Sequence, residues 1–461
     1  MEVQQLNKSQ SDWLEDEAFF TALRAREYQR LDHPLHQVYF DYTGGNLYPA
    51  SLVEKHCEMM LQGVFGNPHS INPTSAKATE MVEAARAKVL SFFNASDYYC
   101  VFTQNASGAL KIVGESYPFG ADTPFVLLSD NHNSVNGIRE FCQQKGGNTH
   151  YVPVRHEDLR IDETVLKTAL EEHAGKGNRL FAMPAQSNVS GVKHGLEWIA
   201  YAQEKGFDVL LDAAAFVPTS RLDLKQVQPE FVSLSFYKIF GYPTGLGCLL
   251  IKKTAFEKLC KPWFAGGTVD VASVCYPFHT LEEGHERFED GTINYLNIPA
   301  LKWGLEFIES IGIERIQKRI NQLTAYLLHH LSTLKHKNGT PVLQILGPKD
   351  TQQRGGTIIM TFHREDGSMI LFEDIEKAAV QKGISLRTGC FCNPGLDEIN
   401  SQISGADLEA FYRSKNFKVQ YHEMLYYKDK VRGATRISVG IATVEKDIQV
   451  LLDFIRHYFQ L

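Results

Sequence analysis

Apolar residues follow two periodicities over the first two thirds of the chain. Short continuous runs favour buried strands, and the stretches 75–93, 162–173 and 195–205 carry apolar residues at helical spacing. The predicted strands are Tyr99–Thr103, Phe125–Ser129, His150–Val154, Arg179–Pro184, Asp208–Asp212, Phe231–Phe236 and Gly247–Lys252. Because helices alternate with strands, the pattern indicates an α/β fold in which a mostly parallel seven-stranded sheet lies between layers of helices.

The pattern changes after about residue 297. A long helical stretch is expected from Ile298 to about Lys335, and mixed strands and helices follow up to Leu461, which indicates a smaller α/β domain. Residues 10–31 have the amphipathic spacing of one or two docked helices. The sequence therefore predicts an N-terminal helical segment (1–36) that packs on the small domain, a large domain (37–297) and the small C-terminal domain (298–461).

Lys238 follows the last-but-one predicted strand of the large domain in a strongly apolar segment. Its neighbours are Phe236, Tyr237, Ile239 and Phe240, and a turn rich in glycine leads on to another apolar run. Desolvation disfavours the ammonium form, so this amine becomes a nucleophile near neutral pH, as a Schiff base to an aldehyde cofactor such as pyridoxal 5′-phosphate (PLP) requires. The alternative is a lysine whose stem packs while its amine reaches solvent.

Polar residues follow other predicted strands at the edge where an open α/β sheet binds ligands. Asn105, Ala106 and Ser107 begin a helix whose N–H groups suit a phosphate, although Asn and Ser are also ordinary helix caps. His132 could stack on an aromatic ring; the alternative is an inert loop histidine. Gln186 could donate to a phenolate oxygen of the cofactor or be a simple turn residue.

Asp212 ends a strongly apolar strand, where a carboxylate is costly to bury unless it is paired. A protonated pyridine nitrogen is one suitable partner, and the pair keeps PLP an electron sink. An arginine partner or a capping role is the alternative. Consecutive strand ends that offer a phosphate site, a stacking ring, a phenolate donor, a pyridinium partner and an amine together favour a PLP enzyme.

Composition narrows the class further. The 461 residues are 43% hydrophobic and carry a net charge of −7, which gives no electrostatic reason to expect nucleic acid or an anionic membrane as a partner. No apolar run approaches the roughly 18 residues of a membrane span, and the N-terminus lacks the layout of a signal peptide. Eight cysteines without a disulfide-scaffold pattern indicate a cytoplasmic protein.

Two of the cysteines occur in the segment Arg387-Thr-Gly-Cys390-Phe-Cys392-Asn-Pro-Gly395. A Cys-x-Cys pair could chelate a metal or form a redox couple, but no second pair with ligand spacing accompanies it, so we expect no metal site. Glycine, asparagine and proline indicate a loop in which thiols are accessible. Arg387 would favour the thiolate, which is the reactive form.

Several segments resemble the class V aminotransferase and cysteine desulfurase group of fold type I PLP enzymes, and most closely the N-terminal desulfurase-like domain of molybdenum cofactor sulfurases. They are Gly66–Ser70, Pro184–Asn188, Ser235–Gly247, Arg287–Thr292 and Leu386–Gly395, and they span residues of about 40 to 440. The resemblance implies a homodimer with active sites at the subunit interface. Ser235 would contact the phosphate of its own subunit and Thr292 that of the neighbour.

The resemblance also implies L-cysteine or a related amino acid as substrate. Cys392 lies five residues after the arginine of the Arg-Thr-Gly motif and would carry a persulfide, while alanine would be released as the product. Cys390 is the alternative carrier of the persulfide. Arg436 would grip the substrate carboxylate, with Arg387 and Asn188 assisting, although an arginine on a strand is also found in surface ion pairs. The persulfide would pass to an acceptor protein or small molecule.

Two alternative functions compete with a desulfurase. In a lyase, epimerase or aminotransferase of the same class, Cys392 would have no catalytic role. A catalytically silent scaffold for sulfur transfer would show no cofactor spectrum. Full molybdenum cofactor sulfurases carry a further C-terminal domain, whereas a last helix is expected here at 444–459, so we expect a free-standing desulfurase. The inserted segment 396–430 would cover the site or meet a partner.

Overall fold

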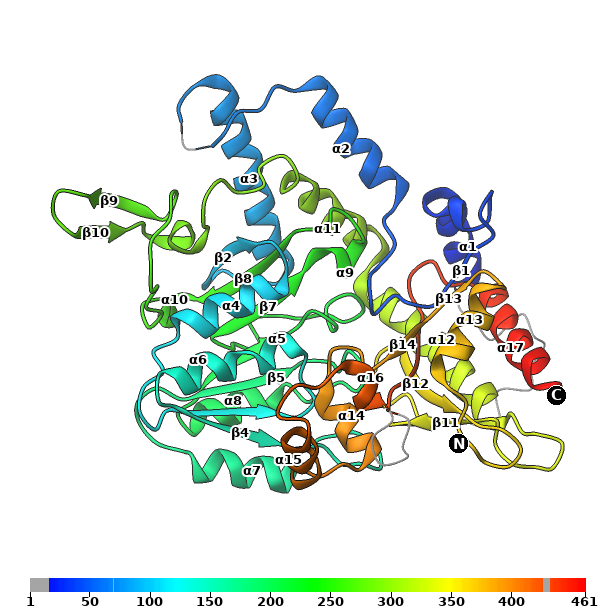
Figure 1. Ribbon diagram of the computed structural model, residues 1–461. Coiled ribbons are helices and arrows are strands. Elements are labelled where there is room, and N and C mark those ends of the chain that lie inside the picture. Colours follow the sequence, from blue (N-terminus) through cyan, green and yellow to red (C-terminus); the bar gives the residue numbers. More distant parts are fainter. Residues whose placement is uncertain (1–15, 69, 426–431) are drawn as a thin grey trace.

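The computed structural model describes residues 16–68, 70–425 and 432–461 (Figure 1). A seven-stranded sheet with the order β2-β8-β7-β6-β5-β3-β4 forms the centre of the larger part. The strands from β7 to β4 pair in parallel, whereas β8 runs antiparallel to both neighbours. Their bounds are β2 (Tyr98–Thr103), β3 (Pro124–Leu128), β4 (Asn148–Val152), β5 (Leu180–Pro184), β6 (Asp208–Asp212), β7 (Phe231–Ser235) and β8 (Gly247–Lys252). The mostly parallel seven-stranded sheet expected from the sequence is confirmed.

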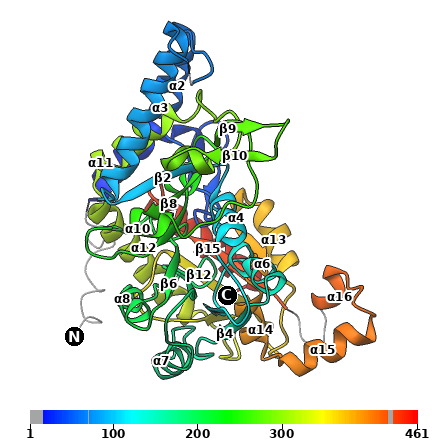
Figure 2. The ribbon, with the colours of Figure 1, turned by 90° about the vertical axis from the view of Figure 1, so that its left-hand side faces the viewer.

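Helices cover both faces of this sheet, because each face buries apolar side chains. One face packs on α4 (Ala106–Ser116), α5 (Asn133–Asn136), α6 (Ile138–Gln144) and α10 (Lys253–Phe256). The other packs on α3 (Pro73–Phe92), α7 (Glu163–Glu172), α8 (Glu197–Glu204) and α11 (Pro299–Ile311). The helix α2 (Ala50–Gln62) and the hairpin of β9 (Val269–Ser273) and β10 (Phe278–Leu281) project from this body, and the short helix η3 (Gly284–Phe288) follows the hairpin (Figures 1 and 2).

A second, antiparallel sheet with the order β11-β12-β15-β14 forms the centre of the smaller part. Its strands are β11 (Leu343–Leu346), β12 (Thr357–Phe362), β14 (Arg387–Gly389) and β15 (Ala434–Ser438). The accompanying helices are α12 (Ile313–Thr333), α13 (Phe372–Val380), α14 (Pro394–Ser401), α15 (Gly405–Ser414), α16 (Tyr421–Leu425) and α17 (Glu445–Phe459). The segment β1 (Val38–Tyr39) pairs in parallel with β13 (Ile384–Ser385), so residues near 40 lie beside this part.

The single long helical stretch expected from residue 298 to about 335 is wrong in one respect. The structure has two helices, α11 and α12, separated by Gly312. Gly312 has φ 91, a left-handed conformation that glycine adopts without the steric cost of a side chain. The chain therefore turns between the two helices, and apolar residues on both sides of the glycine still reach the core.

The N-terminal helix α1 (Glu17–Glu27) lies against helices of the smaller part, and the short helix η2 (Gln29–Leu31) follows it. Arg24 is buried and donates to the carboxylate of Asp447 and to the carbonyl of Ala442, near the start of α17. Glu17 forms an ion pair with Arg319 of α12. Residues 10–15 of the predicted amphipathic stretch lie outside the described residues. Among the helices that the structure describes, none has the length and apolar character needed to cross a bilayer.

Candidate active site

A cavity of about 340 Å³ opens at the carboxyl ends of the parallel strands. It brings together residues from five segments that are far apart in the sequence, as expected for an open α/β sheet. The predicted site residues that line it are Asn105, Ala106, Ser107, His132, Gln186, Asn188, Asp212, Ser235 and Lys238. Four other predicted site residues do not line this cavity: Thr292, Arg387, Cys392 and Arg436.

The N-terminus of α4 forms one end of the cavity. Asn105 caps the helix by accepting from the Gly108 N–H at 2.9 Å, and Ser235 Oγ accepts from the Ala106 N–H at 2.9 Å. Gly247 allows this turn to lie close to β8, because a Cβ there would come within 2.5 Å of the Asn105 backbone. The helix N-terminus and the hydroxyls beside it provide the donors and the dipole that an anionic group such as a phosphate requires.

Two predicted ring-binding residues lie on neighbouring strand ends in the same cavity. His132 caps α5 by accepting from the Ser134 N–H at 3.1 Å, and burial lowers the pKa of its imidazole, which favours the neutral ring. Asp212 Oδ1 accepts from the Ala214 N–H at 3.1 Å and from the Ser233 hydroxyl at 3.0 Å. These two hydrogen bonds hold a carboxylate in the cavity wall, where it suits a positively charged nitrogen.

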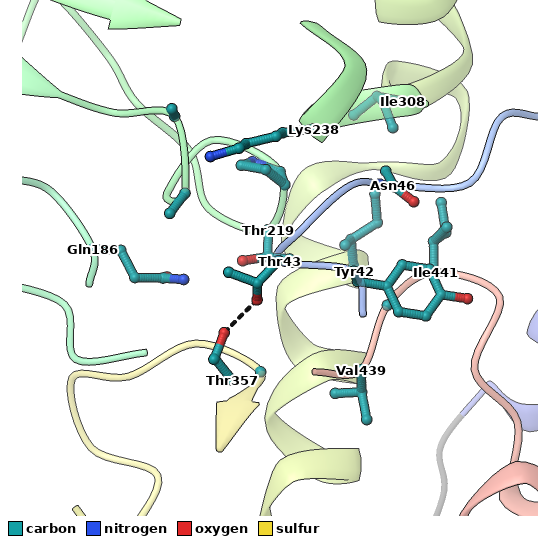
Figure 3. A pocket seen from close by; sticks show the side chains of 16 residues that line it. Tyr42, Thr43, Asn46, Gln186, Thr219, Lys238, Ile308, Thr357, Val439 and Ile441 are labelled. Atoms are coloured by element: carbon teal, nitrogen blue, oxygen red, sulfur yellow. Dashed lines mark hydrogen bonds between the residues drawn. The ribbon is translucent and has the colours of Figure 1, made fainter. Parts of the chain in front are cut away.

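Lys238 lies on the short helix α9 (Phe236–Phe240) rather than in the loop expected from the sequence. Burial lowers the pKa of its amine, as the apolar neighbours predict; the charge of Asp212 opposes that shift and the charge of Arg436 adds to it. Figure 3 shows its side chain extending into the space that Gln186 also faces. The amine is therefore a desolvated nucleophile at the wall of the cavity.

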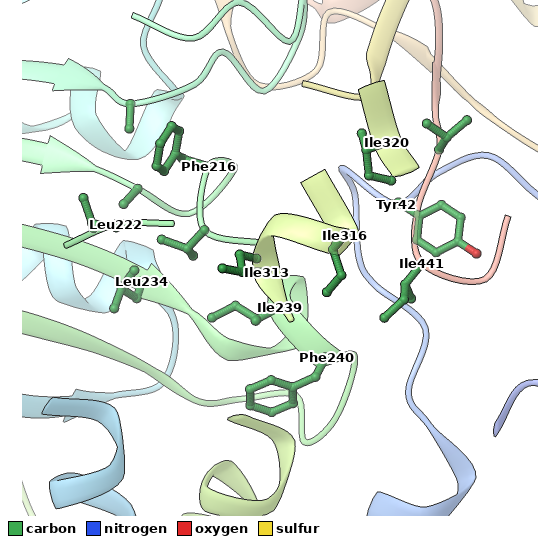
Figure 4. Close-up of a cluster of buried hydrophobic side chains, with 14 of the residues drawn as sticks. Tyr42, Phe216, Leu222, Leu234, Ile239, Phe240, Ile313, Ile316, Ile320 and Ile441 are labelled. Carbon is green, nitrogen blue, oxygen red and sulfur yellow. The ribbon is translucent and has the colours of Figure 1, made fainter. Parts of the chain in front are cut away.

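Apolar packing fixes the helix that carries this lysine. Ile239 and Phe240 belong to the main core together with Leu234 of β7 and residues of α12 (Figure 4). Gly304 of α11 allows close contact, because a Cβ there would lie 2.3 Å from the Phe240 ring. Phe236, Ile239 and Phe240 are thus fixed in the core, which holds the backbone of Lys238 at the wall of the cavity.

A smaller hollow of about 30 Å³ adjoins the cavity behind Lys238. Thr43 and Thr357 close one side of it through a hydroxyl–hydroxyl hydrogen bond of 2.6 Å, drawn as a dashed line in Figure 3. Gln186 Oε1 is buried and has no hydrogen-bond partner among the described residues. An unsatisfied amide oxygen in the wall indicates that a bound group or one ordered water completes the site, since the hollow is large enough for a water molecule.

The loop between β14 and α14 carries both candidate cysteines. Cys392 is exposed to solvent, whereas Cys390 is partly covered. The Asn188 side chain, which lines the cavity, donates to the Phe391 carbonyl at 2.8 Å, and the Asn133 N–H donates to the Cys392 carbonyl at 2.7 Å. The loop is therefore attached to the rim of the cavity, and residues 387–395 are not on a remote surface.

Arg387 and Arg436 stand side by side on β14 and β15, and both bind Asp41. Arg436 is buried and donates to Asp41 Oδ1 at 2.8 Å and to the Asn188 carbonyl at 2.8 Å, while its Nε has no partner among the described residues. Arg387 is half-exposed and donates to the same carboxylate at 2.6 Å. A guanidinium held at the rim with one donor unsatisfied suits a substrate carboxylate.

Asp41 is a residue that the sequence reasoning missed. It is buried and forms ion pairs with two arginines, so it holds them in place and leaves the three groups with one net positive charge. The available signal was a carboxylate in the apolar run Val38–Tyr42, where an unpaired charge is costly. Its partners lie some 350 residues away in the sequence, which is why pattern alone did not find them.

Thr292 lies outside the cavity of its own chain. Its side chain is exposed, in the segment between η3 and α11. Exposed apolar side chains occur nearby on the β9–β10 hairpin and on the segment that follows α2 (Leu61, Val64, Ile71, Val274, Tyr276 and Phe278). The predicted role of Thr292 therefore requires a second chain.

The fold and the cavity define a fold type I PLP enzyme. The model of the family described as aminotransferase class V matches residues 38–451, and the chain belongs to this family. It is 36% identical over 452 residues to molybdenum cofactor sulfurase 3 of Aedes aegypti, covering 93% of this chain and 57% of that protein. It is also 36% identical to the molybdenum cofactor sulfurase of Homo sapiens, over 94% of this chain and 50% of that protein. The chain thus spans about half the length of the curated relatives it matches.

Solved structures of similar fold include cysteine desulfurases and a cystine C–S lyase. The apo enzyme from Thermococcus onnurineus NA1 has a TM-score of 0.79 and 22% sequence identity, over 95% of this chain and 98% of that one. The cysteine desulfurase CsdA from Escherichia coli has a TM-score of 0.76 and 20% identity, over 96% and 98% of the two chains. At this level of identity the likeness shows the fold.

The residues of the cavity fit the cofactor of this family, PLP. The α4 N-terminus with Ser235 suits its phosphate, the neutral His132 ring suits stacking on its pyridine, and the Asp212 carboxylate suits the pyridine nitrogen. The unsatisfied Gln186 amide and the desolvated Lys238 amine complete the lining. When bound, PLP supplies an electron sink for bonds at the substrate α-carbon.

Proposed function

We propose that this protein is a cysteine desulfurase that takes sulfur from L-cysteine as a persulfide on Cys392 and releases alanine. The feature that supports the proposal is the loop with the exposed Cys392 thiol, which is attached to the rim of the cavity through Asn188. A lyase, epimerase or aminotransferase of the same class has no need of an accessible thiol at this rim.

The residues of the chain have distinct tasks in this reaction. Arg436, assisted by Arg387 and Asn188, holds the substrate carboxylate, and the Lys238 amine moves the proton at Cα. The Cys392 thiolate attacks the substrate sulfur, the S–S bond of the persulfide forms and the substrate C–S bond breaks. A proton replaces sulfur on the substrate carbon, so L-cysteine and an enzyme thiol become alanine and an enzyme persulfide, and no external oxidant is needed.

The acceptor of the sulfur would approach through a groove of about 480 Å³ on the outer side of the cysteine loop. Cys392 lines this groove with Arg387, Tyr412 and Arg432, so residues 396–425 of the inserted segment supply part of its wall. Residues 426–430 of that segment lie outside the described residues. We assign the acceptor only as a thiol or another nucleophile that reaches the groove. Because the mechanism requires a reduced thiol, we also propose a reducing compartment such as the cytoplasm.

Incubation of the cofactor-loaded protein with L-cysteine tests this function. We expect one alanine per active site in the absence of an acceptor thiol, and one additional sulfur atom on the peptide that contains Cys392, measured by mass spectrometry. Adding a thiol acceptor such as dithiothreitol should restore continued turnover. A keto acid, a racemised amino acid or an unmodified Cys392 peptide with alanine still released would contradict the proposal.

We further propose a homodimer in which Thr292 completes the phosphate site of the neighbouring chain, because it is exposed and outside its own cavity. Thr292→Asp would place a negative charge beside the phosphate and inactivate the site that it contacts. In a refolded equal mixture of Lys238→Ala and Thr292→Asp chains, a mixed dimer has one intact site, so activity should return to about a quarter of wild type. If Thr292 acted within its own chain, the mixture would stay inactive.

A further inference from the structure

A buried polar cluster beside the cavity involves residues that the mechanism above does not use. Its centre is Asp130, which follows β3, precedes His132 by two residues and is 0% exposed. Its carboxylate accepts from the Ser187 hydroxyl at 2.9 Å, from His194 Nε2 at 3.0 Å and from Asn393 Nδ2 at 2.7 Å. His194 is 4% exposed and Asn393 0%. All three partners donate, so the site requires an acceptor that is a carboxylate.

One of these partners belongs to the cysteine loop. Asn393 is the residue directly after Cys392, and its Nδ2 also donates to Asn188 Oδ1 at 3.1 Å. Its own Oδ1 accepts from the Leu396 N–H and caps α14. The buried Asn393 amide therefore connects the cysteine loop by hydrogen bonds to the rim of the cavity and to the segment after β3.

The backbone of the loop needs such support. Phe391 has φ 56 and Cys392 has φ 55, so two consecutive residues with side chains adopt the left-handed conformation. Residues of this kind keep that conformation where the surrounding contacts over-determine it. The contacts here are the bonds to the Phe391 and Cys392 carbonyls described above and the Asn393–Asp130 bond immediately beyond them.

We propose that Asp130 is a positioning residue that directs the Cys392 thiol toward the substrate sulfur by holding Asn393. Loss of the Asp130–Asn393 hydrogen bond would let the loop leave its strained conformation and would slow sulfur transfer, while binding of PLP and proton movement at Cα would continue. This inference rests on the proposed function, which makes Cys392 the sulfur carrier.

The test compares two reactions of one cofactor-loaded variant. Exchange of the Cα hydrogen of L-alanine with deuterium oxide depends on Lys238 and PLP but not on the thiol, whereas alanine release from L-cysteine in a single turnover depends on all of them. Asn393→Ala should reduce alanine release by about tenfold or more and leave the Cα exchange within about twofold. Asp130→Asn, which replaces an acceptor oxygen by a donor, should give the same split. Asn400→Ala, an amide-to-methyl change on the neighbouring helix α14, should change neither rate.

Alanine release by Asn393→Ala within about twofold of wild type would overturn the proposal, and so would an equal fall of both rates, which indicates general damage to the fold. Hydrogen exchange of the backbone amides in 387–395 tests whether Asp130 and Asn393 hold the loop, independently of whether the protein is a desulfurase. That exchange should be about tenfold faster in Asn393→Ala than in wild type. A wild type that releases no alanine would overturn the proposed function alone, and unchanged amide exchange would overturn the positioning role of Asp130.

Discussion

Replacing Lys238 by alanine should abolish the visible absorbance of lysine-bound PLP and lower the rate of alanine release from L-cysteine by about 10⁴-fold. The amine is desolvated, its pKa is lowered by burial, and the packing of Ile239 and Phe240 directs it into the cavity. Alanine leaves no group there that binds the cofactor or takes a proton. The measurements are the absorbance spectrum of the purified protein and single-turnover alanine release.

Lys193 provides the matched control for this variant. Burial lowers the pKa of its amine to about 8, yet its side chain is not part of the cavity lining. Lys193→Met keeps the stem and should leave both the spectrum and the rate within about threefold of wild type. A normal cofactor spectrum in Lys238→Ala, or loss of the spectrum in Lys193→Met, would show that the nucleophile has been misassigned.

Replacing Cys392 by alanine should lower alanine release from L-cysteine by about 10³-fold while the cofactor spectrum stays that of wild type. The thiol is exposed at the rim of the cavity and its loop is attached to Asn188, so alanine at this position removes the proposed nucleophile and leaves the residues that line the cavity unchanged. The experiment measures alanine under single-turnover conditions and the sulfur content of the loop peptide.

Cys390→Ala is the control within the same loop. Cys390 lines the same groove as Cys392 but is partly covered, whereas Cys392 is exposed, so the loss of Cys390 should change alanine release by about threefold at most. A large loss in Cys390→Ala combined with normal release in Cys392→Ala would assign the persulfide to the first cysteine. Equal rates in both variants and wild type would remove the persulfide step altogether.

The local pattern of apolar and polar residues was sufficient to predict the strands of the large domain. The apolar runs marked all seven strands of the central sheet to within two residues, because buried parallel strands read as continuous apolar segments whatever surrounds them. The polar residues that follow these strands line one cavity, since the carboxyl ends of parallel strands meet at one edge. The lowered pKa of Lys238 also follows from its immediate neighbours, which are apolar in the sequence as in the structure.

The local sequence pattern did not predict which residues far apart in the sequence form hydrogen bonds with one another. The sequence alone determined the class of fold, the polar strand-end residues that line one cavity and the position of the two cysteines in one loop, because each depends on neighbours within a few positions. Only the tertiary structure decided that Asp41 holds Arg387 and Arg436, and that Asp130 holds Asn393, because these hydrogen bonds join residues separated by 263 to 395 positions. A charged residue in an apolar segment predicts that the charge is paired, because burying it unpaired is costly. Which residue pairs with it depends on how the two parts of the chain pack.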